Sequence, residues 1–232
     1  KPARQAVEQA LERINRHEPV QYVLGEAWFY GRKFLVNNSV LIPRPETELL
    51  VDVVKQHLAQ SSIRPINIVD LCTGSGCIGI TLARELPQAQ VHLTDISYGA
   101  IYVAAMNARA HRVAVSLKQH DVLTDRLDEP VDIIVSNPPY VLEREKNEMQ
   151  KQVLQHEPAL ALFVPDDDPL RFYKPLAALA ARWLLPGGML GVEVNPLYAE
   201  DIKKLFGAIG LGRVTIHFDL DGRPRFVSAL HM

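Results

Sequence analysis

The chain has 232 residues, of which 47% are hydrophobic and 22% are charged, a composition typical of a globular protein with one good core. Its formal net charge of −2 argues against a protein that binds mainly by neutralising phosphates, so we expect no stable nucleic-acid partner. No apolar run reaches the ~18 residues that a membrane span needs, and we expect a cytoplasmic monomer that binds no membrane.

The two cysteines, Cys72 and Cys77, lie around a glycine-rich turn. No His or further Cys stands at metal-ligand spacing, so we predict no metal site. Two cysteines do not make a disulfide framework, which favours a reducing compartment. We interpret both as small, weakly polar residues that fill a tight turn.

The first part of the chain predicts a helix followed by a small hairpin. Apolar residues within 3–16 recur on one helix face. The next stretch is rich in Gly, Pro and aromatic residues, which favours a hairpin or small cap, and Pro45 then opens a helix that runs to about Gln60. We therefore expect residues 1–62 to form an N-terminal helix, hairpin and linking helix, with a boundary near residue 62.

From about residue 63 strands and helices alternate, which predicts a catalytic α/β domain over residues 63–232 with a mostly parallel sheet and helices on both faces. The last two strands have no helix between them, so they pair as a hairpin and make one of seven strands antiparallel. The predicted strands cover 66–71, 91–95, 115–119, 131–136, 189–194, 214–219 and 225–232. The predicted helices cover 77–86, 98–110, 169–185 (stopped by the PGG at 186–188) and 197–209.

A glycine pattern follows the first strand of this alternation. Gly74, Gly76 and Gly79 fit GxGxxG between a strand and a helix. Asp95 ends the next strand about twenty residues later, where a carboxylate can accept from two ribose hydroxyls. Together they predict a site for an adenosine-containing ligand.

Acidic residues narrow the choice of ligand. Asp70, just before the glycine turn, would repel a pyrophosphate but suits the ammonium and sulfonium of S-adenosylmethionine. Asp121, at the end of the third strand, is predicted to accept from the adenine amino group. Each acid has a structural alternative: a helix cap for Asp70, a turn for Asp95, a solvated loop for Asp121. Three acids that end three consecutive strands beside one glycine turn favour ligand binding.

The fourth strand ends in the stretch 136–140, SNPPY. Its prolines cannot continue a ladder and leave carbonyl acceptors exposed. Asn137 adds a side-chain carbonyl and Tyr140 a flat ring. Such a site suits a planar –NH2 group, because two acceptors hold its hydrogens, aim the nitrogen at a methyl carbon and stabilise the charge that develops. The alternative is a proline turn with a packed Tyr.

Through these residues the chain resembles the HemK family of protein-(glutamine) methyltransferases, within the Rossmann-like class I S-adenosylmethionine-dependent methyltransferases. The resemblance runs from about His17 to the end and rests on GEAWFYGRKFLVNNSVLIPRPETELLVD, DLCTGSGCI, TDIS, SNPPYV, HEPALAL and LPGGMLGVEV. It implies methyl transfer from S-adenosylmethionine to a glutamine side-chain amide, with S-adenosylhomocysteine as the product. One branch modifies the Gly-Gly-Gln glutamine of peptide-chain release factors and another a large-subunit ribosomal protein. The stretch 143–173 resembles the release-factor branch.

The resemblance and the residue-level reasoning together give a set of predicted site residues. Those predicted to act in catalysis are Asn137, Pro138 and Tyr140. Those predicted to hold the substrate are Asn137, Pro138, Pro139 and Tyr140. Those predicted to hold the cofactor are Asp70, Cys72, Thr73, Gly74, Ser75, Gly76, Asp95, Asp121, Val122 and Asn137.

Three features depart from the family pattern. Cys72 stands where many members have Gly, which predicts a negative φ or a slightly different turn. Val122 stands where some members have an aromatic residue beside the adenine, which predicts either an aliphatic adenine wall or no contribution from Val122. The family's N-terminal helical domain is usually longer, and this chain begins without Met, so we expect a truncated substrate-docking domain.

The resemblance leaves three positions without a chemical role. Arg44 has three interpretations: it holds the cofactor carboxylate, it holds a substrate backbone, or it pairs on the surface with Glu46 or Glu48, the common outcome for a lone Arg. His156 and Glu157 are expected to shape the rim of the site.

Three rival functions have less support. A nucleic-acid amino-methyltransferase would bind the same planar –NH2 but must flip a base, and the net charge argues against it. A dehydrogenase would use GxGxxG, but Asp70 and the lack of a Tyr-x-x-x-Lys pair argue against it. A non-catalytic binding module would keep the glycine turn without needing NPPY.

Overall fold

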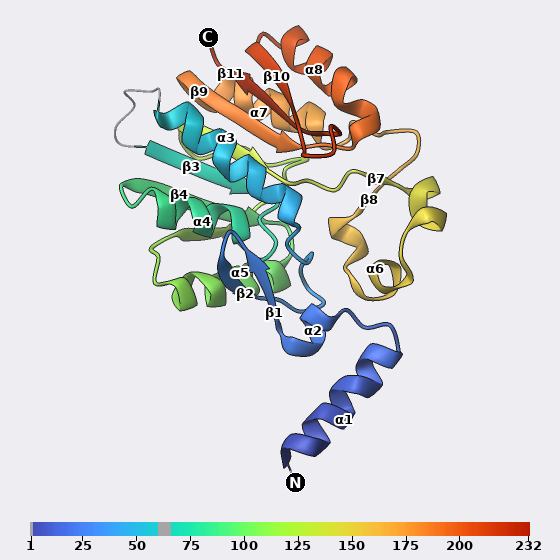
Figure 1. The fold of residues 1–232 in the computed structure, drawn as a ribbon. Helices are drawn as coiled ribbons and strands as arrows, with labels where there is room; N and C mark the ends of the chain where they lie inside the picture. The colour runs from blue at the N-terminus through green and yellow to red at the C-terminus, as the bar shows by residue number, and fades with distance from the viewer. Residues whose placement is uncertain (1, 60–65) are drawn as a thin grey trace.

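A seven-stranded sheet lies at the centre of the computed structural model, which describes residues 2–59 and 66–232 (Figure 1). Its strand order is β10-β11-β9-β6-β3-β4-β5. The strands of this sheet are β3 (Ile66–Leu71), β4 (Ala89–Asp95), β5 (Ser116–Gln119), β6 (Val131–Ser136), β9 (Leu184–Glu193), β10 (Gly212–Phe218) and β11 (Pro224–Leu230). Two small sheets pair β1 (Glu26–Phe29) with β2 (Arg32–Leu35) and β7 (Val141–Leu142) with β8 (Phe163–Val164).

The helices are distributed along the whole chain. The α-helices are α1 (Pro2–Asn15), α2 (Val20–Leu24), α3 (Glu48–Ala59), α4 (Cys77–Glu85), α5 (Tyr98–His111), α6 (Lys151–His156), α7 (Tyr173–Trp183) and α8 (Ala199–Ala208). Four 3-10 helices cover Pro45–Thr47, Glu143–Glu148, Ala159–Ala161 and Pro196–Tyr198. Within the described residues, no helix combines the length and the apolar character that crossing a membrane requires.

The predicted sheet is confirmed in its strand number and directions. Strands β3, β4, β5, β6 and β9 pair parallel with their neighbours. Strand β11 is antiparallel both to β9 and to β10, because the chain returns directly from β10 as a hairpin. The fold is therefore a Rossmann-like α/β fold with one antiparallel strand.

Helices cover both faces of the sheet and form two cores. Alternate residues of each strand point to opposite faces, so in β3 Ile68 packs into the cluster under α3, α4 and α5, whereas Val69 packs into the cluster under α7 and α8. Both are almost fully buried. Continuous apolar strands such as β6 follow from this burial on two faces.

The N-terminal hairpin shares a core with the sheet. Phe29 and Phe34 are fully buried in the same cluster as Leu50 of α3 and Ile68 of β3. Helix α1 projects away from the sheet in Figure 1. The domain boundary predicted near residue 62 lies outside the described residues, so the division into 1–62 and 63–232 stays a prediction.

The helix predicted for 169–185 is too long, and the PGG at 186–188 does not separate it from the next strand. Pro175 has no N–H and fits a helix only in its first turn, which is consistent with α7 beginning at Tyr173. Strand β9 begins at Leu184 and runs through the PGG, where Gly187 has a φ of +81° and donates its N–H to the His231 carbonyl at 2.8 Å. The sequence pattern does not predict helix α6 or the pairing of β7 with β8.

Candidate active site

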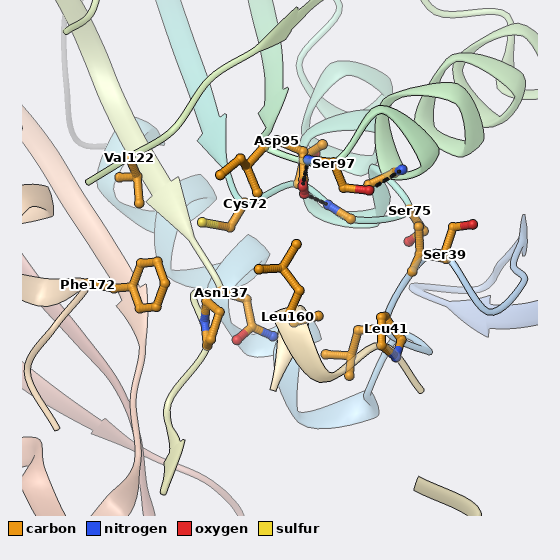
Figure 2. A pocket seen from close by; sticks show the side chains of 18 of the residues that line it. Ser39, Leu41, Cys72, Ser75, Asp95, Ser97, Val122, Asn137, Leu160 and Phe172 are labelled. Atoms are coloured by element: carbon orange, nitrogen blue, oxygen red, sulfur yellow. Dashed lines mark hydrogen bonds between the residues drawn. The ribbon is translucent and has the colours of Figure 1, made fainter. Parts of the chain in front are cut away.

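A cavity of about 450 Å³ opens at the carboxyl ends of β3, β4 and β6. Open α/β sheets bind ligands at this edge. In Figure 2, Cys72, Asp95 and Asn137 approach the cavity from three strand ends, Ser39 and Leu41 from the N-terminal side, and Leu160 and Phe172 from the segment after α6. The floor therefore belongs to the sheet, and the walls come from two segments outside it.

The glycine-rich loop uses left-handed backbone at alternate positions. Cys72, Gly74 and Gly76 have φ values of +60°, +55° and +81°. The negative φ considered for Cys72 is therefore wrong: the turn keeps the conformation that favours Gly, and Cys72 adopts it at a cost of about 1–2 kcal/mol. The loop is held to the next strand, because Thr73 N donates to the Thr94 carbonyl at 2.9 Å.

Asp70 lies under the loop and does not line the cavity. It is fully buried, and its Oδ2 accepts from Thr73 Oγ1 at 2.6 Å and from Gly79 N at 2.9 Å. Burial raises the pKa of Asp70 to about 7. Asp70 thus lies one layer below the cavity lining, where it ties the loop to the start of α4. That position matches the structural alternative more closely than direct contact with an ammonium group.

Asp95 reaches the cavity rim. Its Oδ2 accepts from Gly74 N and its Oδ1 from Ser97 N, both at 2.9 Å. Burial raises the pKa of this carboxyl above its ordinary value, and the two amides oppose the rise. Each oxygen keeps a second lone pair for a ligand hydroxyl, so the carboxylate is oriented by the loop and available to a ribose.

Asp121 and Val122 both line the cavity. Asp121 Oδ1 accepts from Leu123 N at 2.9 Å, which fixes the turn after β5. Val122 is 5% exposed, and Phe172 from a distant segment lies on the same side of the cavity in Figure 2. The wall near Val122 is therefore mixed rather than purely aliphatic, because the aromatic ring comes from a different part of the chain.

The NPPY residues divide between the cavity and the core. Asn137 and Pro139 line the cavity, whereas Pro138 is buried and lines none of it. Tyr140 Oη donates to Glu193 Oε1 at 2.9 Å, and burial raises the pKa of this phenol well above its ordinary value. Tyr140 does not line the cavity, so the stacking role predicted for its ring stays a prediction.

Arg44 pairs with Glu157 and not with Glu46 or Glu48, so the surface-pair interpretation is wrong. Its guanidinium lies 2.6 Å from Glu157 Oε1, and the Glu157 side chain is 1% exposed. The other oxygen, Oε2, accepts from Ile42 N at 3.0 Å. Arg44 also lines the cavity. Glu157 therefore fastens the segment before the 3-10 helix Pro45–Thr47 to the segment after α6 and holds the two walls together.

Sequence reasoning missed several residues that shape the site. Asn107 on α5 is fully buried and donates to the carbonyls of Ser75 (2.8 Å) and Leu35 (3.0 Å), while its Oδ1 accepts from Leu35 N at 2.7 Å. It thus joins the hairpin to the glycine loop. The only signal was a polar residue on an apolar helix face. The unpredicted wall residues include Ser39, Leu41, Leu160 and Phe172.

The cavity provides groups for an organic ligand. Over residues 2–59 and 66–232 no cluster of three His, Cys, Asp or Glu side chains could hold a metal ion. Burial raises the pKa of Cys77 to about 12, so this thiol stays neutral and unreactive. An oriented carboxylate, a glycine loop and a partly aromatic wall fit an adenosine-containing cofactor. Because Asn137 and Pro139 of the NPPY stretch line the same cavity, the site is that of a Rossmann-like S-adenosylmethionine-dependent methyltransferase.

Comparison with known proteins agrees with this class. Residues 45–162 match the family described as "Methyltransferase small domain". The release factor glutamine methyltransferase of Flavobacterium psychrophilum is 42% identical over 95% of this chain and 78% of its own length. That of Bacteroides thetaiotaomicron is 42% identical over 96% of this chain and 80% of its own length. The chain belongs to the release factor glutamine methyltransferase family.

Solved structures agree in fold at low sequence identity. A methyltransferase from Pyrococcus furiosus superposes with a TM-score of 0.61 at 14% identity, covering 96% of this chain and 98% of its own. A 16S rRNA methyltransferase of T. thermophilus, solved with AdoMet and guanosine, has a TM-score of 0.60 at 18% identity and covers 89% of this chain and 50% of its own. These similarities concern the fold alone.

Proposed function

We propose that this protein transfers a methyl group from S-adenosylmethionine to the side-chain amide nitrogen of the glutamine in the Gly-Gly-Gln motif of peptide-chain release factors. The observation that carries the proposal is the position of Asn137, whose amide enters the same cavity as Asp95 and the glycine loop. The names of the relatives at 42% identity support the substrate.

The cofactor would be held by groups that the fold has already oriented. Asp95 would accept from the ribose hydroxyls, and Gly74 would allow close approach, since a Cβ built there meets nothing within 4 Å and the residue has a positive φ. Val122 and Phe172 would enclose the adenine. When bound, the cofactor supplies a methyl group on a positively charged sulfur.

The chain's own residues orient the amide that receives the methyl group. An amide nitrogen is a poor nucleophile because its lone pair is delocalised. The Asn137 side-chain carbonyl and a carbonyl of the NPPY loop would accept its two hydrogens and direct the nitrogen toward the methyl carbon. The same oxygens stabilise the positive charge that develops on nitrogen. The surplus proton then leaves to solvent, so no side-chain base is needed beforehand.

Apolar residues of the cavity wall would enclose the substrate amide, the role that the sequence assigns to the Tyr140 ring. Pro139, Leu160 and Phe163 line the cavity, and Leu160 is 59% exposed at its edge. An apolar rim excludes water from the polar acceptors and strengthens their hydrogen bonds. The glutamine would therefore enter past apolar groups and meet the acceptors at the bottom.

The test is a transfer assay with methyl-labelled S-adenosylmethionine. Intact release factor, a release factor with Gln→Ala in its Gly-Gly-Gln motif, a ribosomal-protein mixture and DNA are offered side by side. We expect label on the intact release factor only, and loss of transfer in Asn137→Ala with most cofactor affinity retained. Label on a ribosomal protein or on DNA would overturn the substrate, and near-normal turnover by Asn137→Ala would overturn the role of NPPY.

A further inference from the structure

Glu193 is a buried carboxylate at the end of β9 with no part in the mechanism above. It is 2% exposed and does not line the cavity. Its Oε2 accepts from Thr47 Oγ1 at 2.6 Å, and its Oε1 accepts from Tyr140 Oη at 2.9 Å. One carboxylate therefore joins the segment that opens α3 to the last residue of the NPPY loop.

Stability alone does not explain a carboxylate at this position. Burial raises the pKa of Glu193, and the hydroxyls of Thr47 and Tyr140 oppose the rise. Replacing Glu193, Thr47 and Tyr140 together by apolar side chains could pack with equal or better stability, whereas an apolar residue at Glu193 alone would leave two hydroxyls without an acceptor. An apolar side chain cannot hold the hydroxyls of Thr47 and Tyr140, which belong to different segments, at a fixed distance from each other.

The orientation of Asn137 depends on this region. None of the side-chain hydrogen bonds found within residues 2–59 and 66–232 involves the Asn137 amide, which projects into the cavity in Figure 2. Its direction therefore comes from its backbone. On one side Ser136 Oγ donates to the Leu71 carbonyl at 2.7 Å. On the other side two prolines with fixed φ lead to Tyr140.

We propose that Glu193 is a positioning residue that sets the direction of Asn137 by holding Tyr140 against Thr47. The proposal rests on the proposed function, because Asn137 is the group that would accept from the substrate amide. A small shift of a positioned group can lower a rate by about 10²-fold. Loss of the Glu193 carboxyl should therefore lower kcat while leaving cofactor affinity close to that of the unmodified protein.

The experiment compares three substitutions in methyl transfer to release factor. Glu193→Ala removes both hydrogen bonds, and we expect kcat to fall about 10²-fold. Glu193→Gln keeps one acceptor and offers a donor to the other hydroxyl, which can reverse its role, so we expect most of kcat to return. Tyr140→Phe removes one of the two bonds, and its effect should not add to that of Glu193→Ala if both act through the same contact.

Asp132→Ala is the matched control. Asp132 is 3% exposed on the neighbouring strand β6 and accepts from Asn67 N at 2.7 Å, at the opposite edge of the sheet from the cavity. The Asp132→Ala substitution removes a buried carboxylate that has no contact with the NPPY loop. The free energy of unfolding should therefore fall, while kcat should equal that of the protein without substitutions. Equal kcat in Glu193→Ala and Asp132→Ala, or a Gln variant as defective as the Ala variant, would overturn the proposal.

Hydrogen exchange separates this proposal from the proposed function. Val141 N donates to the Leu162 carbonyl at 2.9 Å directly after Tyr140. We expect faster exchange at the Val141 amide in Glu193→Ala and an unchanged rate in Asp132→Ala. Failure of the protein without substitutions to label release factor would refute the proposed function. Unchanged exchange at the Val141 amide in Glu193→Ala would refute the positioning role, whatever the substrate.

Discussion

Gly79 lies where helix α4 packs tightly against strands β3 and β4. A Cβ built on Gly79 would overlap Leu93 Cδ2 and would lie 3.0 Å from Asp70 Oδ2. Leu93 and Asp70 are both fully buried, so neither has room to give way. Substituting Ala at this position should therefore disturb both the core and the carboxylate under the glycine loop.

The magnitude follows from two opposing effects. Overpacking a well-filled core costs about 1–3 kcal/mol, whereas replacing Gly by Ala within a helix gains about 0.5–1 kcal/mol. Gly207→Ala in α8 is the matched control, because its added Cβ meets nothing within 4 Å. The difference between the two variants isolates overpacking, so Gly79→Ala should have a free energy of unfolding about 1–3 kcal/mol lower than that of Gly207→Ala.

Urea unfolding followed by circular dichroism measures both free energies. Calorimetry with S-adenosylmethionine adds a second readout. Because a displaced Asp70 would no longer hold Thr73, Gly79→Ala should bind the cofactor more weakly. Gly207→Ala should bind it as tightly as the protein without substitutions. If Gly79→Ala gains stability by the same margin as Gly207→Ala, the close seating of α4 against β4 is wrong.

Three further predictions concern acidic side chains. Asp95→Asn should weaken S-adenosylmethionine binding about ten- to hundred-fold, the loss expected for a hydrogen bond to a charged group, and an unchanged Kd in calorimetry would contradict the ribose role. Glu157→Ala leaves Arg44 and Ile42 N without their acceptor. Because Arg44 keeps partial exposure, the free energy of unfolding in urea should fall by about 1–3 kcal/mol. An unchanged urea midpoint would contradict the contact between the two walls. Since burial raises the pKa of Asp70 to about 7, its folded form keeps a proton that the unfolded form releases near pH 4, so its contribution to stability is lost as pH rises from about 4 to 7. In Asp70→Asn the free energy of unfolding should therefore fall less steeply between pH 4 and 7 than in the protein without substitutions. Urea unfolding at several pH values measures this slope, and equal slopes for the two proteins would exclude the raised pKa of Asp70.

The sheet was predictable because its signals are local. Continuous apolar runs such as 131–136 identify strands buried on two faces, and the direct return from β10 to β11 leaves only an antiparallel pairing. The start of α7 was missed because the apolar period continues through 169–172, while Pro175 limits how far the helix extends. The PGG at 186–188 predicts the end of a helix, but the positive φ of Gly187 lets strand β9 run through it.

The site was predictable where one short segment supplies it and not where distant segments meet. The glycine loop, Asp95 and Asn137 follow from motifs at strand ends. The contact between Arg44 and Glu157 spans 113 residues, and that between Thr47 and Glu193 spans 146. Neither hydrophobic periodicity nor motif spacing predicts a contact between residues so far apart in the chain. The same limit applies to Tyr140, whose hydroxyl bonds to Glu193 on β9, 53 residues away in the chain.

The cavity wall formed by Ser39, Leu41 and Arg44 has a consequence for protein engineering. Because this wall precedes the sheet in the chain, the sheet and its glycine loop are not a portable catalytic module. A chimera that exchanges the N-terminal region replaces a recognition surface and reshapes the reaction chamber in the same step. Substrate range and turnover would therefore change together in such chimeras, and altering one alone requires substitutions within the wall.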